Sequence, residues 1–265
     1  MYANYHTHTY RCHHATGTDE EYIQKAIAEN IKVLGFSDHA PYLYPNGYVS
    51  YYKMLPEEAE EYMSSLRALR EKYRDKIEII IGYEAEYYPD LWEETFEFWK
   101  KCPPEYLILG QHFFSDEYVP REALLKAPKP MDNPDLFKKY VDTAIVAMET
   151  GVFTYIAHPD IPNFTGDEDL YRSEMERLIL AAKANRLPLE INLHGMITGA
   201  NYPCRKFWEI AAKHKPDVII GCDAHNPSEL GNTDNIARAL RLIDGLDLNL
   251  IDRVTPVNPF KNINM

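Results

Sequence analysis

"KVLGFSDHAP", residues 32–41, is an apolar run that ends in an acid, a histidine and a proline. A short apolar run bounded by polar sequence is typical of a strand that is buried on both faces. Six further runs of this kind recur along the 265 residues: "YANY" (2–5), "IEIIIGY" (77–83), "YLILG" (106–110), "FTYIAH" (153–158), "LPLEIN" (187–192) and "DVIIGC" (217–222). With residues 32–37, they predict seven strands.

Charged amphipathic stretches alternate with these strands and predict helices at 19–31, 56–74, 90–101, 134–150, 171–185, 203–214 and 227–243. Alternating strands and helices favour a parallel sheet, since each helix carries the chain back over the sheet. At this length the expected fold is a single α/β domain over residues 1–265, a distorted (β/α)7 barrel of the TIM-like kind. An open, doubly wound sheet is the alternative.

The composition is that of an ordinary globular protein, with 45% hydrophobic and 26% charged residues. A formal net charge of −13 argues against general binding to nucleic acid or to an anionic membrane surface. We find no signal-like apolar segment and no run long enough to cross a bilayer. The four cysteines are widely spaced and form no C-x-x-C pair, which suits a reducing compartment. A cytoplasmic location is expected.

Histidines and acids gather where the predicted strands end. Functional side chains of parallel βα folds lie at the carboxyl ends of the strands, so residues from different strands meet on one face. Chance placement at six strand ends is the competing explanation, and the irregular sequence "HTHTYRCHHA" (6–15) excludes an expression tag. The residues at these ends are His6, His8, His14, Asp38, His39, Glu84, His112, His158, Asp160, Asp223 and His225.

The local spacing suits metal coordination. Residues two apart in extended chain point the same way, so His6 and His8 can face one ion, as can Asp223 and His225. Imidazoles mixed with a few carboxylates match zinc, manganese or iron rather than calcium or magnesium. Nine candidate ligands predict two or three divalent first-row transition metal ions.

The motifs resemble the PHP (polymerase and histidinol phosphatase) family, and more narrowly its histidinol-phosphatase branch. They occur in family order as "HTHT" (6–9), "HA" (14–15), "FSDHAP" (36–41), "GYE" (82–84), "GQHF" (110–113), "AHPD" (157–160) and "CDAH" (222–225). The resemblance covers essentially the whole chain. It implies a distorted seven-stranded barrel with a trinuclear metal centre.

The resemblance also implies a distribution of ligands. The first metal would be held by His6, His8, Glu84 and Asp223. Glu84 would bridge to a second metal, completed by His112 and His158. The third would be held by His14, His39 and His225, where the family's histidine before alanine selects His14 over His13. Asp38 and Asp160 are candidates for orienting the neighbouring imidazoles.

The predicted activity is phosphomonoester hydrolysis. A multinuclear site provides hydroxide near neutral pH, which would attack phosphorus, with Asp223, Glu84 and His225 as the expected catalytic residues. The expected partner is a small phosphorylated metabolite, L-histidinol phosphate of histidine biosynthesis, with another small phosphoester as the alternative.

Substrate contacts are predicted for Arg11, Arg205 and His194. The segment "EINLHGMITGANYPCRKF" (190–207) keeps Asn192, Gly195 and Tyr202-Pro203 of the branch's pattern but lacks its phosphate-binding arginine. Arg205 or Lys206, or else His194, would have to compensate. Two loops, 41–52 and 113–132, are candidates for the rim of the pocket.

Two other classes compete with this prediction. One is an amidohydrolase-like C–N hydrolase, which also gathers histidines at barrel strand ends but usually has a lysine ligand where this chain has Glu84. The other is a metal-binding module without catalysis. Phosphate release from phosphomonoesters separates the three.

Overall fold

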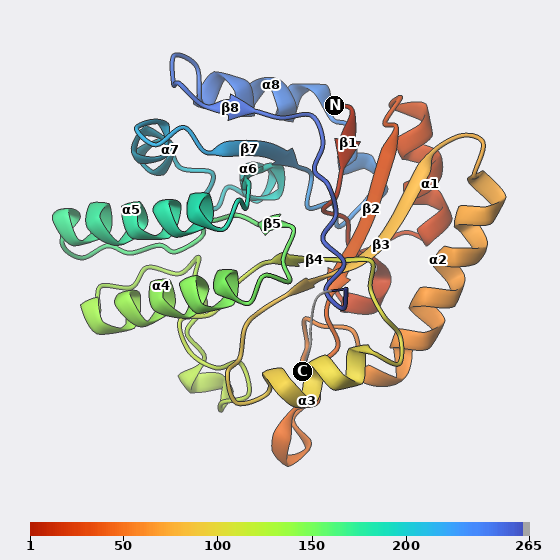
Figure 1. The fold of residues 1–265 in the computed structure, drawn as a ribbon, viewed down its shortest axis with the longest axis horizontal. Helices are drawn as coiled ribbons and strands as arrows, with labels where there is room; N and C mark the ends of the chain where they lie inside the picture. Colours follow the sequence, from red (N-terminus) through yellow and green to blue (C-terminus); the bar gives the residue numbers. More distant parts are fainter. Residues whose placement is uncertain (262–265) are drawn as a thin grey trace.

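Eight parallel strands in sequential order make up the sheet of the computed structural model, which describes residues 1–261 (Figure 1). Each strand pairs with the next one along the chain, from β1 to β8, as the alternation of strands and helices predicts. The strands are β1 Ala3–Asn4, β2 Val33–His39, β3 Glu78–Ala85, β4 Tyr106–Leu109, β5 Tyr155–Ile156, β6 Leu189–Asn192, β7 Asp217–Gly221 and β8 Asn249–Leu250.

Helices surround the strands (Figure 1). Their starts carry sequence signals: Thr18 and Glu21 form a reciprocal capping box at α1, and Asn133 accepts hydrogen bonds from the first turn of α4. The α-helices are α1 Asp19–Ala28, α2 Ala59–Tyr73, α3 Trp92–Trp99, α4 Pro134–Glu149, α5 Glu168–Ala184, α6 Leu193–Thr198, α7 Arg205–Ala212 and α8 Thr233–Leu242. Short 3₁₀ turns are η1 Tyr10–Cys12, η2 Pro45–Gly47, η3 Pro56–Glu58, η4 Arg121–Ala123 and η5 Pro227–Glu229.

The sheet curls into a distorted barrel that closes at the carboxyl ends of its strands. Beyond β1, Thr7 forms a parallel bridge with Ala224, which follows β7. The His8 amide donates to the Ala224 carbonyl at 3.0 Å, and the Ala224 amide donates to the His6 carbonyl at 3.3 Å. β8 pairs only with the first two residues of β7, Asp217 and Val218, at the amino end of the barrel. Seven strands therefore surround the end of the barrel that carries the histidines.

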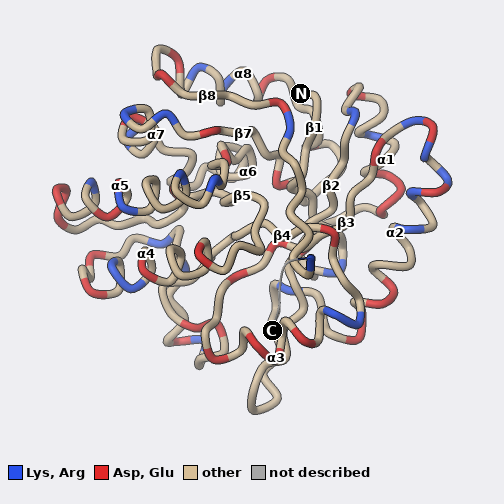
Figure 2. Tube along the Cα trace, in the orientation of Figure 1, with Lys and Arg blue, Asp and Glu red and all other residues tan. Residues whose placement is uncertain are grey.

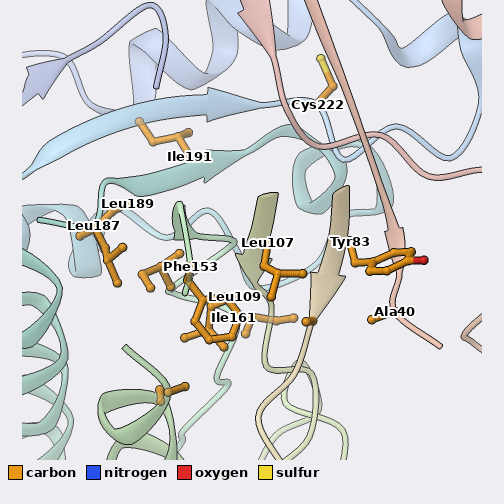
Figure 3. Packing of buried hydrophobic residues seen from close by; sticks show 14 of the residues in the cluster. Ala40, Tyr83, Leu107, Leu109, Phe153, Ile161, Leu187, Leu189, Ile191 and Cys222 are labelled. Carbon is orange, nitrogen blue, oxygen red and sulfur yellow. The ribbon is translucent and has the colours of Figure 1, made fainter. Parts of the chain in front are cut away.

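Two layers of buried side chains support this arrangement. The larger lies between the strands and the helices, and Figure 3 shows part of it, with Leu107, Leu109, Phe153 and Ile161 grouped together. The smaller fills the barrel interior and includes Tyr5, Tyr106 and Tyr155, each at most 1% exposed. The Tyr106 hydroxyl donates to the Tyr5 carbonyl at 2.7 Å, so its polar tip is satisfied inside the barrel.

The chain after β8 crosses the amino end of the barrel towards α3 (Figure 1). The Tyr5 hydroxyl donates to the Val254 carbonyl at 3.3 Å, and the Val257 amide donates to Thr154 Oγ1 at 3.0 Å. Phe260 packs against Phe96 of α3. This segment closes the end of the barrel opposite to the histidines.

The seven predicted strands are all present, with two differences in detail. β2 and β3 run further than their apolar runs, so Asp38, His39 and Glu84 belong to the strands themselves. β8 and α6 were not predicted, because two residues of strand and six of helix carry too little periodicity to stand out.

Charged residues lie mainly on the outer helices, and most of the central strand residues are uncharged (Figure 2). Within residues 1–261, no helix is long and apolar enough to span a membrane.

Candidate metal centre

Glu84, near the end of β3, is surrounded by imidazoles from four other strand ends. Its side chain is buried, and its two carboxylate oxygens lie 2.8–3.5 Å from ring nitrogens of five histidines. The separations are 2.8 Å to His158, 3.0 Å to His39, 3.4 Å to His112 and 3.5 Å to both His6 and His8. The convergence predicted from the strand ends is therefore present.

Asp223, which follows β7, is a second meeting point. Its Oδ1 lies 3.0 Å from His8 Nε2, 3.4 Å from His6 Nε2 and 3.4 Å from His225 Nδ1. The Asn192 side-chain amide donates to the other oxygen, Oδ2, at 3.0 Å. This hydrogen bond fixes the carboxylate with Oδ1 facing the imidazoles.

The remaining histidines form the outer part of the cluster. His14 Nε2 lies 3.0 Å from His225 Nε2, and the His14 ring centroid is 5.4 Å from that of His39. His13 has a left-handed backbone (φ 64°), and its imidazole lies 3.6 Å from Glu58, away from the cluster. Of the two adjacent histidines, the structure brings His14 to the site.

The oxygen and nitrogen atoms of the cluster are arranged as ligands to cations rather than as hydrogen-bond partners of one another. Glu84 Oε2 and Asp223 Oδ1 are buried and accept no hydrogen bond from any of residues 1–261. The Nε2 atoms of His6 and His8 face each other at 3.2 Å, a contact that at most one proton can bridge. Buried carboxylate oxygens without donors, beside imidazole nitrogens that face one another, are the arrangement expected around divalent ions. The residues present thus form a site suited to metal binding.

The carboxylates of the cluster favour positive charge on some of the neighbouring imidazoles. Burial opposes protonation of His6, but Asp223, Glu190 and Glu84 outweigh it and raise the pKa of His6 to about 10. Burial, followed by the charge of His8, holds the pKa of His39 well below its usual value. In the absence of metal, the two pKa values are thus shifted in opposite directions. Divalent cations would replace those protons and let each imidazole present a lone pair.

Three carboxylates orient imidazoles from behind. Asp38 Oδ1 lies 3.3 Å from His8 Nδ1, as expected for an orienting residue. Glu190 lies 2.8 Å from His6 Nδ1, and Glu86 lies 3.2 Å from His112 Nδ1. The sequence analysis does not single out Glu190. Glu86 lies two residues after Glu84 and on the same face, and the glycine-x-glutamate pattern selects Glu84 instead as the ligand. Such partners fix the ring orientation and raise its basicity.

Asp160 has a different role from the one predicted. Its Oδ2 accepts hydrogen bonds from the Cys204 amide at 2.6 Å and from Trp208 Nε1 at 3.1 Å, and it contacts no imidazole among residues 1–261. Asp160 therefore anchors the start of α7 to the loop after β5.

The backbone makes room for the buried carboxylates. A Cβ atom on Gly110 would lie 2.0 Å from Glu84 Oε1, and one on Gly221 would lie 1.8 Å from Glu190 Oε1. The first glycine precedes "QH" after β4, and the second ends β7. His158 and Asp223 also have positive φ angles of 32° and 49°. Such conformations cost about 1–3 kcal/mol each and cluster at functional sites.

Glu190 offers a test of the supporting carboxylates. It bonds His6 Nδ1, the His158 amide at 3.0 Å and the Asn192 side chain at 2.9 Å. Glu190→Gln should lower metal affinity roughly 10–100-fold, because His6 loses its anionic partner. Competition against a chelator measures this, with Glu176→Gln, on the outside of α5, as the control. Unchanged affinity in Glu190→Gln would show that this carboxylate does not support the ligand.

A cavity of about 160 Å³ opens directly onto the cluster. Histidines and Asp223 form one side, and Tyr52, Lys53, Phe113, Lys126 and Tyr202 lie around the rest. Lys53 is only 2% exposed and is paired with Glu86 at 2.6 Å and Glu117 at 2.7 Å. Cys12 is buried behind the site, where its thiol donates a hydrogen bond to the Thr9 carbonyl at 3.1 Å.

Of the three predicted substrate-binding residues, the structure brings only His194 to this cavity. Its ring centroid lies 4.5 Å from that of His225. The Arg11 guanidinium is 1% exposed and pairs with Asp19 at 2.9 Å and Glu61 at 2.6 Å. Arg205 is exposed and bonds Glu209 and the carbonyls of Leu242 and Asp244. Both arginines have structural partners, which differs from the expected contact with substrate.

Comparisons with known proteins agree with this geometry. The chain is 26% identical over 228 residues to a probable histidinol-phosphatase of Deinococcus radiodurans, covering 85% of this chain and 87% of that protein. It is 25% identical over 252 residues to a probable phosphatase of Acetivibrio thermocellus, covering 90% and 86%.

A similar fold occurs in a solved phosphatase structure. Histidinol phosphate phosphatase of Lactococcus lactis, crystallised with zinc, L-histidinol and phosphate, has a TM-score of 0.69 at 16% identity, covering 94% of this chain and 95% of that one. Residues 4–194 of this chain also match the PHP domain family. With its distorted barrel and its buried cluster of histidines and acids at the strand ends, the chain belongs to the PHP domain family.

Proposed function

We propose that the protein is a metal-dependent phosphomonoesterase. The observation that carries the proposal is the convergence on Glu84 and Asp223. Within residues 1–261, one buried oxygen of each, Glu84 Oε2 and Asp223 Oδ1, accepts no hydrogen bond, while imidazole nitrogens lie within 3.5 Å of it. We propose the ligand set His6, His8, His14, His39, Glu84, His112, His158, Asp223 and His225, for two or three ions of zinc, manganese or iron.

Glu84 is the proposed bridging carboxylate, since its two oxygens face different imidazoles. Oε1 lies nearest to His158, and Oε2 lies nearest to His39. Divalent ions bound here would supply a hydroxide nucleophile near neutral pH and neutralise the phosphate oxygens. The chain itself places Asp223 at the edge of the cavity, where its carboxylate can accept a proton.

The rim of the cavity contains groups that can bind the ester. His194 and Lys126 line it, and each can donate a hydrogen bond to a phosphate oxygen. Tyr52, Phe113 and Tyr202 offer apolar surface to the leaving group. These residues take the place of the arginine that the segment 190–207 lacks.

L-Histidinol phosphate is the specific substrate to test first, because the sequence resemblance and the names of two similar proteins point to it. Loaded with zinc, manganese or iron, the purified protein should release inorganic phosphate from phosphomonoesters and should leave amide substrates intact. Chelation should abolish the release, and restoring metal should recover it.

The measurement is a phosphate assay on L-histidinol phosphate, phenyl phosphate and a small amide, at several metal loadings. Amide turnover without phosphate release would favour a C–N hydrolase. No turnover of any substrate by a protein with bound metal would favour a non-catalytic module. Either result refutes the proposal.

A further inference from the structure

A second and larger cavity adjoins the one over the metal centre. It measures about 460 Å³ and lies between the loops 41–52 and 113–132, which the sequence marked as candidates for the rim. A cavity of this size accommodates a small molecule. Its lining consists of aromatic, aliphatic and basic residues.

The larger cavity is lined by positive charge, whereas the chain as a whole has a net charge of −13. Arg121, Lys126 and Lys129 line it, and none of its lining residues is acidic, although the chain has 41 acids and 28 bases. Within residues 1–261, no carboxylate lies within 4.0 Å of the charged nitrogens of these three residues. Cations without anionic partners, grouped around one concave surface, favour an anionic ligand.

Two residues belong to both cavities and link them. Tyr52 and Lys126 line the larger cavity and the cavity over the histidines. Lys126 Nζ contacts the Tyr52 hydroxyl and lies 3.9 Å from the ring centroid. Tyr52 also packs edge-on against His14, with centroids 6.0 Å apart. A molecule with its phosphate at the metal centre, if long enough to pass Tyr52 and Lys126, would enter the larger cavity.

We propose that the larger cavity is the leaving-group subsite, and that it selects phosphomonoesters whose alcohol carries a second anionic group. The second group, a carboxylate or a further phosphate, pairs with Arg121 and Lys129, while the carbon skeleton packs on Tyr48 and Tyr52. This inference rests on the proposed phosphatase activity. It assigns to the two loops a specificity that the metal ligands do not determine.

The test compares matched aromatic esters that differ in one charged group. Phenyl phosphate is the reference, because its leaving group carries no further charged group. The leaving groups of 4-(carboxymethyl)phenyl phosphate and 4-(phosphonomethyl)phenyl phosphate carry a carboxylate and a phosphonate. We expect the wild type to prefer an anion-bearing ester in kcat/KM. Lys129→Ala or Arg121→Ala should each reduce that preference about tenfold, the loss expected for one charge-assisted hydrogen bond.

The ratio of kcat/KM for the anion-bearing ester to kcat/KM for phenyl phosphate is taken within each variant, which removes differences in folding and metal content. Comparing this ratio between variants removes the difference in intrinsic reactivity of the two esters. Lys213→Ala, at the far end of α7 and exposed, is the matched control and should keep the wild-type ratio. Lys129→Glu should shift the preference towards 4-(aminomethyl)phenyl phosphate, whose leaving group is cationic. L-Histidinol phosphate carries an ammonium as well, so the same variant should favour it relative to the wild type.

Binding gives a readout that does not depend on turnover. Calorimetric titration with 4-(carboxymethyl)benzylphosphonate and with benzylphosphonate should show tighter binding of the first, and Lys129→Glu should remove the difference. If phenyl phosphate is hydrolysed but the ratios are the same in the wild type and both alanine variants, the subsite assignment is refuted and the phosphatase activity stands. If no ester releases phosphate, both are refuted.

Discussion

Glu84→Gln is expected to remove nearly all turnover and at least one bound metal ion per chain. Glu84 is the acid that faces five imidazoles, and glutamine keeps its size while removing the negative charge. Ligands to multinuclear sites act as a unit, so losing the bridging carboxylate should affect more than one ion. A loss of about 4 kcal/mol in transition-state stabilisation corresponds to roughly a thousandfold lower kcat.

The matched control lies on the same strand. Glu78 begins β3, is exposed, and is at the opposite end from the cluster. Glu78→Gln should leave kcat and metal content at wild-type values. The two variants are compared by phosphate release and by elemental analysis of the purified proteins. Wild-type metal content together with wild-type kcat in Glu84→Gln would contradict the proposed bridging role.

Arg11→Met is expected to cause the largest loss of stability. Arg11 donates two hydrogen bonds to Asp19, both at 2.9 Å, and Asp19 is 5% exposed at the start of α1. Methionine fills similar volume but leaves the Asp19 carboxylate buried without its cation. Breaking one side of a buried ion pair costs about 3 kcal/mol or more, which for a chain of this length lowers Tm by about 6–12 °C.

Arg205→Met is the surface control. Arg205 is exposed, and its partners are Glu209 one helical turn away and the solvent-exposed carbonyls of Leu242 and Asp244. Its replacement should therefore change stability by less than about 1 kcal/mol. Adding Asp19→Asn to Arg11→Met should recover part of the lost stability, because the stranded charge is removed. Thermal and urea unfolding measure these effects. Equal Tm values for the Arg11 and Arg205 variants would show that the buried pair does not stabilise the fold.

The parts of the structure that the sequence predicts are those governed by repetition. Buried strands recur as apolar runs, and parallel pairing places all of their carboxyl ends together. The positions of Glu84, His158 and Asp223 on one face follow from that geometry alone. The short β8 and the six-residue α6 lack such a pattern, and their existence depends on tertiary contacts.

The contacts of individual charged side chains could not be predicted in the same way. Arg11 lies in the histidine-rich first loop, which suggested contact with substrate, yet acids from α1 and α2 reach it first. Glu190 lies in an apolar run and Glu86 directly follows β3, so nothing local marks them as partners of His6 and His112. Their roles depend on which residues the neighbouring strands place opposite them.

The central claim is that the buried cluster of histidines and acids holds metal ions, and the amount of metal in the purified protein tests it most directly. Elemental analysis of wild-type protein prepared in the presence of zinc, manganese and iron, then freed of loosely bound metal, should give two to three first-row ions per chain. Fewer than about one ion for every ten chains, in protein that is folded by circular dichroism, would contradict the account.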